Sequence, residues 1–401
     1  MTAHISLPNQ GEIPSISSKR LPWAGLLALA MAGFICILTE SLPAGLLPQI
    51  AKDLGITEAL TGQLVTLYAI GSLVAAIPLT AATRGWRRRP LLLVCISGFL
   101  VFNTVTALSS DYILTLAARF MAGVSAGVLW GMTAGYARRM VPDSLKGKAM
   151  AVAMVGTPVA LALGVPIGSF LSSYVGWRLI FGMVSLLTVA LIVWVLWKMP
   201  DFAGEPAGER LPLHKVFLIP GVRPILFVVL AWMLAHNILY TYISPYLAQT
   251  VFANRVDLIL LIFGITSIVG IWLTGMLIDR FLRRLVIISL ATFALASVVM
   301  GIGTHQPMII ILGIMIWGIT FGGAATLLQT AIAQAGGKST DVAQSMLVTA
   351  WNLAIGGGGI IGGILLELFG AGYLSGALFI LLIPALLVAM RAYKYGFTRA
   401  N

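Results

Sequence analysis

The sequence predicts an all-α polytopic membrane protein, with twelve transmembrane helices arranged in two pseudo-repeat halves of six. Of the 401 residues, 59% are hydrophobic and only 9% are charged, whereas about a quarter of the residues in a soluble domain are charged. Apolar runs of roughly 18 or more residues recur from end to end, and each is long enough to cross the hydrocarbon layer as a helix. Because these runs are continuously apolar, they exclude a transmembrane barrel, whose strands alternate in segments of about ten residues.

The twelve predicted spans follow one another with short polar connections. In order they are 22–47, 57–79, 90–108, 113–136, 146–171, 176–198, 222–250, 256–278, 285–304, 307–334, 341–368 and 372–392. The first run continues well past the apolar region of about 7–15 residues in a signal peptide, so we expect it to remain as a helix. Both cysteines, Cys36 and Cys95, fall within spans. This placement indicates neither a disulfide framework nor a metal site, and we expect no cofactor.

A polar segment rich in Pro, Gly and charge divides the spans six and six. The sequence therefore predicts a cytoplasmic tail at 1–21, a six-helix half at 22–198, a cytoplasmic linker at 199–221, a second six-helix half at 222–392 and a cytoplasmic tail at 393–401. With both termini cytoplasmic, all but four of the 25 Lys and Arg lie in cytoplasmic segments. The four exceptions are Lys52, Arg119, Arg178 and Arg255. This is the positive-inside bias, so the net charge of +12 reports topology and not nucleic-acid binding.

An internal repeat relates the two halves. The loop after the second span reads "TRGWRRRP" (83–90), and the loop after the eighth reads "DRFLRRLV" (279–286), so one shift superposes their arginines. The same shift carries Glu40 onto His236, which are the lone ionisable groups deep in their spans. Repeats of this kind build transporters that hold a midplane site between two rocking halves.

At these residues the chain resembles the major facilitator superfamily, and within it the drug:proton antiporter-1 family and its bacterial sugar- and nucleoside-efflux branch. "GMLIDRFLRR" (275–284) is similar to the superfamily's cytoplasmic loop motif. The matching residues, which the resemblance assigns to gating, are Gly275, Asp279, Arg280, Arg283 and Arg284. In the first-half copy Thr83 stands where the motif has Asp, so the arginines after it have no local acid.

Two further stretches carry the resemblance. "GTPVALALGVPIGSFL" (156–171) resembles the fifth-helix motif of exporters, and its Gly and Pro residues are expected bending points for alternating access. They are Gly156, Pro158, Gly164, Pro166 and Gly168. "LAARFMAGVSAG" (116–127) resembles the fourth-helix motif and contains Arg119. From here glycines recur every four residues, at 123, 127, 131 and 135, which predicts a smooth face for close helix packing.

Candidate site residues follow from charges placed inside apolar spans. A charge buried alone in lipid costs at least about 2.5–3.5 kcal/mol, so Glu40 and Arg119, at similar depth, are expected to pair or to face a watery cavity. The resemblance implies that both line the central cavity. We infer that Glu40 is the proton carrier, and His236, as an ionisable residue inside a span, is a further coupling candidate. A Glu40 that snorkels to the outer surface, and a His236 that is a satisfied core histidine, remain open. The candidate substrate-binding residues are Asn237, Tyr240, Trp130, Trp317 and Gln329.

The function implied by the resemblance is export of a small molecule, a sugar, nucleoside or drug-like compound, by proton antiport in the bacterial inner membrane. The protein is expected to be a monomer in the lipid bilayer that handles substrate and protons and binds no nucleic acid. Proton-coupled or facilitated uptake is the main alternative. A transport-dead sensor would normally carry an additional soluble domain, and a membrane-embedded enzyme would need clustered catalytic groups. We therefore expect no enzymatic activity.

Overall fold

The computed structural model describes residues 21–76, 78–83, 85–142, 145–204 and 213–397. In the first half of the chain the elements are α1 (Trp23–Gly45), α2 (Leu47–Leu54), α3 (Glu58–Ala76), α4 (Pro78–Ala82), α5 (Arg88–Leu108), α6 (Tyr112–Arg139), α7 (Lys146–Met154), α8 (Gly156–Val159), the π-helical turn η2 (Ala160–Gly164), α9 (Val165–Val175) and α10 (Trp177–Lys198). In the second half they are α11 (Leu213–Phe217), α12 (Val222–Thr241), α13 (Ile243–Ala248), α14 (Val256–Ile302), α15 (Pro307–Gly336), η3 (Gly337–Ser339), α16 (Thr340–Phe369), η4 (Ala371–Tyr373) and α17 (Leu374–Arg391).

The predicted fold class is confirmed. Among the described residues, eleven helical stretches are long and apolar enough to cross a membrane. One of them, α14, is 47 residues long and contains both the eighth and the ninth predicted spans. Its backbone leaves helical geometry at Phe281 (φ −131°, ψ 21°), inside the predicted cytoplasmic loop. Counting α14 as two crossings restores the twelve predicted spans.

The fifth and seventh spans are interrupted rather than straight. α7, α8, η2 and α9 follow one another through the fifth span, and the π-helical turn η2 lies between Pro158 and Pro166. Proline lacks the N–H that the helical ladder requires, and single π turns are the usual local adjustment. In the seventh span, Tyr242 separates α12 from α13 with φ −108° and ψ 29°.

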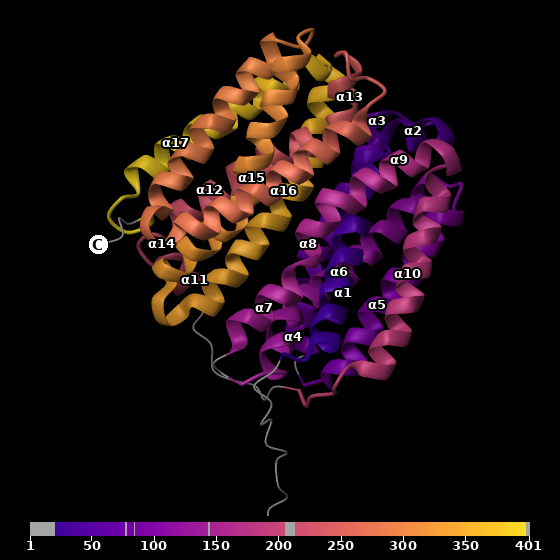
Figure 1. The fold of residues 1–401 in the computed structure, drawn as a ribbon, viewed down its shortest axis with the longest axis vertical. Helices are drawn as coiled ribbons and strands as arrows, with labels where there is room; N and C mark the ends of the chain where they lie inside the picture. Colours follow the sequence, from indigo (N-terminus) through magenta and orange to yellow (C-terminus); the bar gives the residue numbers. More distant parts are fainter. Residues whose placement is uncertain (1–20, 77, 84, 143–144, 205–212, 398–401) are drawn as a thin grey trace, which may run out of the picture.

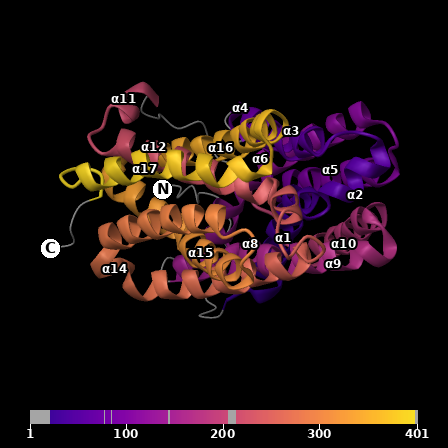
Figure 2. The ribbon, with the colours of Figure 1, turned by 90° about the horizontal axis from the view of Figure 1, so that it is seen from above.

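The two halves approach each other at one end only (Figure 1). They meet at the end that carries α2, α9 and α13, which is the predicted outer end, and diverge toward the end that carries α4, α7 and α11. The most extensive contacts between the halves are those of α3 with α16 and of α14 with η2 and α9, and α1 also contacts α12 and α13. Viewed from above, the halves lie side by side (Figure 2). The contact is close, because a methyl group on Gly264 of α14 would lie 2.9 Å from the carbonyl oxygen of Ala162 in η2.

Within each half, glycines allow neighbouring helices to touch through their backbones. A methyl group on Gly123 would lie 2.7 Å from the carbonyl carbon of Tyr68, and methyl groups on Gly127 and Gly131 would also clash with α3 and α4. Among the described residues, Gly135 has nothing within 4 Å. The predicted packing face is therefore confirmed for its first three glycines, and the fourth makes no such contact with the part of the chain that the structure describes.

Candidate functional site

Arg119 lies inside α6, and its side chain is completely buried. Its Nε donates to the carbonyl oxygen of Leu64 at 3.3 Å, and its Nη2 donates to the carbonyl oxygen of Glu40 at 3.3 Å. The guanidinium also lies over the Tyr68 ring, 4.9 Å from its centroid. The third nitrogen, Nη1, is buried and has no hydrogen-bond partner among the described residues. A buried cation thus keeps one donor unused, which is unusual because buried polar groups are nearly always paired.

Glu40, on α1, is half-buried beside this arginine. The structure brings the two predicted residues into contact, but through the backbone of Glu40. Within the part of the chain that is described, no ion pair joins the Glu40 carboxylate to a base. The sequence predicts that Glu40 and Arg119 pair or share a cavity. In this conformation the two residues are adjacent, but the Glu40 carboxylate forms no ion pair with any described residue.

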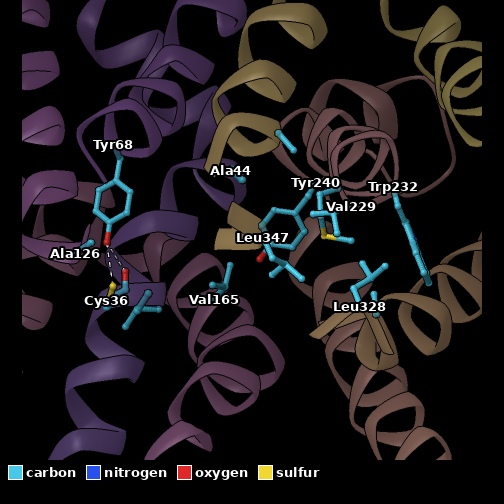
Figure 3. Packing of buried hydrophobic residues seen from close by; sticks show 14 of the residues in the cluster. Cys36, Ala44, Tyr68, Ala126, Val165, Val229, Trp232, Tyr240, Leu328 and Leu347 are labelled. Atoms are coloured by element: carbon cyan, nitrogen blue, oxygen red, sulfur yellow. Dashed lines mark hydrogen bonds between the residues drawn. The ribbon is translucent and has the colours of Figure 1, made fainter. Parts of the chain in front are cut away.

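The surroundings of Glu40 in the first half are polar and ordered. Asn103 Nδ2 donates to Thr39 Oγ1 at 2.9 Å, and the Tyr68 hydroxyl donates to the carbonyl oxygen of Cys36 at 3.0 Å. Figure 3 shows Tyr68 directed at Cys36 beside Ala126. These bonds fix α1 against α3 and α5, so the position of Glu40 is set by its neighbours on both sides.

His236, on α12, lies in an aromatic cluster. Its ring stacks on Phe321 with centroids 3.5 Å apart and planes at 7°, and its Nδ1 accepts a hydrogen bond from Trp317 Nε1 at 3.0 Å. The tryptophan indole can only donate, so Nδ1 carries no proton and the imidazole is neutral here. In this conformation His236 has the bonding of a satisfied core histidine, and its part in proton coupling stays a prediction.

The candidate substrate-binding residues are not gathered in one place. Trp317 is completely buried against His236, and Tyr240 is buried against the same cluster. Asn237 instead faces α16, where a methyl group on Gly358 would lie 2.6 Å from its Cβ. Asn237 and Tyr240 are three residues apart on α12, which leaves about 60° between their side chains around the helix, and in this conformation they contact different neighbours. Their part in substrate binding stays a prediction.

The Tyr240 hydroxyl has no hydrogen-bond partner among the described residues, although it is buried. In Figure 3 this hydroxyl points away from Trp232, toward the side where Ala44 and Val165 of the other half lie. Trp130 is half-buried and touches Gly33 of α1.

Gln329 lies elsewhere, on an open cavity of about 480 Å³. The lining residues are Thr326, Gln329, Thr330, Ala333 and Gln334.

The predicted gating residues of the fifth span pack against α1. A methyl group on Gly156 would lie 2.7 Å from the backbone nitrogen of Phe34, and one on Gly168 would lie 2.6 Å from Leu42. Gly164 also faces α1, because a methyl group there would lie 3.1 Å from both Phe34 and Leu38. Pro158 and Pro166 flank the π-helical turn η2.

The loop motif of α14 is open to its surroundings. Gly275 has no atom of the described residues within 4 Å, and Asp279 and Arg280 are exposed. Arg283 Nη2 donates to the carbonyl oxygen of Met390 at 2.8 Å, and the Arg284 guanidinium lies 5.4 Å from the Phe281 ring centroid. Their gating role stays a prediction.

One charged contact that sequence reasoning missed involves Asp201, which follows α10. Its Oδ2 lies 2.5 Å from Arg87 Nε, and its Oδ1 accepts from the backbone N–H of Arg89 at 3.1 Å. Partial desolvation opposes ionisation, but the hydrogen bonds from Arg87 and Arg89 outweigh it and lower the pKa of Asp201. Asp201 thus supplies the acid that Thr83 does not. The available signal was the Asp that directly follows span six in "KMPDF".

Comparison with known proteins agrees with this architecture. The model of the Major Facilitator Superfamily matches residues 29–337. A probable sugar efflux transporter of Pasteurella multocida (strain Pm70) is 24% identical over 397 residues, covering 97% of both chains. Another, from Helicobacter acinonychis (strain Sheeba), is 28% identical over 363 residues, covering 90% of this chain and 92% of the relative.

Solved structures share the fold. A bacterial homolog of the human lysosomal transporter Spinster, in an inward-facing and occupied conformation, has a TM-score of 0.72 at 16% identity, covering 94% of this chain and 98% of that one. A human organic anion transporter has a TM-score of 0.70 at 17% identity, covering 92% of this chain and all of the other. With twelve crossings in two halves and a family match over most of its length, the chain belongs to the Major Facilitator Superfamily of transporters.

Proposed function

We propose that this protein exports a small, hydroxyl-rich molecule of the sugar class in exchange for protons, by alternating access. Relatives named as probable sugar efflux transporters align over nearly the whole chain. The observation that carries the proton-coupling part is the unused Nη1 of buried Arg119 next to Glu40. This donor is the natural partner for a carboxylate that is free to turn toward it.

The coupling step follows from the two charge states of Glu40. When Glu40 is ionised, its carboxylate turns to Arg119 Nη1, because a charge-assisted bond in a buried site is strong. When Glu40 takes up a proton, that attraction falls and the side chain is released. The conformation described here, with the carboxylate unpaired, corresponds to the released state. Arg119 stays in place in both states through its bonds to the carbonyl oxygens of Leu64 and Glu40.

The substrate path uses the end where the halves diverge. Neutral hydrogen-bonding side chains, three of them Thr326, Gln329 and Thr330, line the open cavity on α15. Such groups suit an uncharged polar solute better than an ion. Substrate enters from this predicted inner side, and the halves then rock to open the outer side, where protons enter.

The test is transport into inverted membrane vesicles, in which an exporter accumulates its substrate. Labelled mono- and disaccharides are offered with and without a pH gradient, to the wild type, to Glu40→Gln and to Glu58→Gln. Glu58 is the matched control, a carboxylate at the start of α3 and not beside Arg119. We expect Glu40→Gln to abolish gradient-driven accumulation while sugar exchange without a gradient persists, and Glu58→Gln to behave as the wild type.

Three results would contradict the proposal. Normal gradient-driven accumulation in Glu40→Gln would remove Glu40 from the proton path and favour the snorkelling interpretation. Sugar accumulation in right-side-out vesicles alone would establish uptake as the physiological direction. If the wild type accumulates none of the sugars but does accumulate a solute of another class, proton antiport would stand and the proposed sugar substrate would be rejected.

A further inference from the structure

The outer ends of the two halves are joined by a small set of polar contacts around Tyr242. Its ring is completely buried between α12 and α13. The hydroxyl donates to the carbonyl oxygen of Gly359 on α16 at 2.7 Å, and it lies 3.4 Å from Gln63 Nε2 on α3. Tyr242 and Gly359 belong to the second half, and Gln63 belongs to the first. The hydroxyl therefore lies on the boundary between the halves.

Gln63 reaches across that boundary. Its Nε2 donates to the carbonyl oxygen of Gly359 at 3.1 Å, and also to the carbonyl oxygen of Ala59 on its own helix at 3.1 Å. The carbonyl of Gly359 thus receives one bond from each half. We call Gln63, Tyr242 and the Gly359 carbonyl the outer clasp. Two neighbouring bonds, Thr66 Oγ1 to the Gly356 carbonyl at 3.4 Å and Thr57 Oγ1 to Glu367 at 3.1 Å, run along the same seam.

Glycines shape the space that the tyrosine occupies. A methyl group on Gly62 of the first half would lie 2.7 Å from Cε1 of Tyr242, and one on Gly362 of the second half would lie 2.6 Å from its Cδ2. The ring is therefore held between backbones of opposite halves. No larger residue fits at either glycine without moving the tyrosine out.

We propose that the outer clasp sets how readily the outer side opens, so that Gln63 and Tyr242 govern the step at which substrate leaves. This inference rests on alternating access as given under the proposed function. To open outward, α3 must part from α16, and every clasp bond that crosses between the halves is lost. The hydrogen bond between Tyr242 and Gly359 stays within the second half and orients the hydroxyl for Gln63.

The test measures outward opening directly. Val65 is buried with Ala69 and Ile355 between α3 and α16, immediately beyond the clasp. A Val65→Cys reporter is labelled in intact cells with a membrane-impermeant maleimide, and the chain without the reporter gives the background from Cys36 and Cys95, which are both buried. Losing one net hydrogen bond corresponds to a population change of about three- to tenfold. We expect Gln63→Met and Tyr242→Phe each to raise the labelling rate by about that factor.

Matched controls distinguish loss of the outer clasp from a general destabilisation of the protein. Tyr246→Phe removes another buried tyrosine hydroxyl, whose bond to the Met300 carbonyl lies within the second half, and it should leave the rate unchanged. Gly62→Ala should raise the rate at least as much as Tyr242→Phe, whereas Gly182→Ala, where no described residue lies within 4 Å, should not. The double variant Gln63→Met with Tyr242→Phe should show less than the product of the two single effects, because both act on one set of bonds.

Wild-type labelling in Gln63→Met and Tyr242→Phe would overturn the clasp, and so would an equal increase in Tyr246→Phe. These outcomes are distinguishable from failure of the proposed function. If Glu40→Gln transports normally, proton coupling through Glu40 fails while the labelling comparison still supports the clasp. If no variant is ever labelled, even with substrate and a pH gradient, alternating access and the clasp both fail.

Discussion

Because α3 and α6 approach each other closely, we predict that a single added methyl group at their contact changes the stability of the protein. In Gly123→Ala the new Cβ would lie 2.7 Å from the carbonyl carbon of Tyr68 and 3.0 Å from its Cα, against an ordinary contact of 3.4–4 Å. The obstructing atoms are backbone, so the two helices must separate by several tenths of an ångström or more. Overpacking of this kind costs about 1–3 kcal/mol.

The intrinsic preference of the helix acts in the opposite direction. Alanine in a helix interior is favoured over glycine by about 0.5–1 kcal/mol. The net loss in Gly123→Ala is therefore about 0–2.5 kcal/mol in the free energy of unfolding. Gly135→Ala lies about three helical turns farther along α6 and has nothing within 4 Å in the described part of the chain, so it gains the preference without the clash.

The assay is thermal unfolding of purified protein in one detergent, followed by tryptophan fluorescence. We expect the melting temperature to fall in Gly123→Ala and to stay level or rise in Gly135→Ala. Equal melting temperatures for the two variants would show that the helices can separate freely at Gly123. The argument that backbone contact fixes this helix pair would then be refuted.

Two further predictions concern single polar contacts. Asp201→Asn removes the ion pair with Arg87 and should lower the melting temperature at pH 7. Because the pKa of Asp201 is lowered in the folded protein, the stability that its carboxylate contributes is fully present above the ordinary aspartate pKa of about 4. That stability is lost as the pH falls through the lowered pKa, so the melting temperatures of the wild type and Asp201→Asn should converge in acid. A difference in melting temperature that stays constant at all pH values would contradict the pairing. Trp317→Phe leaves His236 Nδ1 without its donor and should cost about 1–3 kcal/mol in the free energy of unfolding, with substrate-induced proton release intact. Loss of that proton release would instead give His236 a part in coupling.

Much of the architecture could be predicted because it depends on composition and on local spacing. Span length follows from the thickness of the hydrocarbon layer, and the four-residue glycine spacing on α6 follows from helix geometry. The same spacing could not reveal which of these glycines lies against another helix, and among the described residues nothing lies within 4 Å of Gly135. α14 reads as two spans in the sequence because charged residues interrupt it, and in the structure the backbone leaves helical geometry among those residues, at Phe281.

The contacts of the candidate site were harder to predict because they join distant parts of the chain. Asp201 lies 114 residues from Arg87, and Tyr242 lies 179 residues from Gln63. The local sequence does not indicate which of several residues with the same kind of side chain will be the partner. Glu40 and Arg119 could be proposed as neighbours because charges in apolar spans are rare and costly. That Arg119 holds the backbone of Glu40, and not its carboxylate, depends on side-chain geometry that no pattern contains.

The π-helical turn in the fifth span has a geometric consequence for the glycines on either side of it. Gly156 and Gly168 are twelve residues apart, and in an uninterrupted α-helix they would point about 120° away from each other. Both nevertheless contact α1, at Phe34 and Leu42 respectively. The turn from Ala160 to Gly164 accommodates about one extra residue, which rotates everything after it back by about 100°. Deleting one residue from this turn would turn it into regular α-helix and leave Gly156 and Gly168 eleven residues apart, about 20° from each other around the axis, so Gly168 would still face α1. The π-helical turn therefore absorbs a surplus residue and keeps one face of the span on α1 along its whole length.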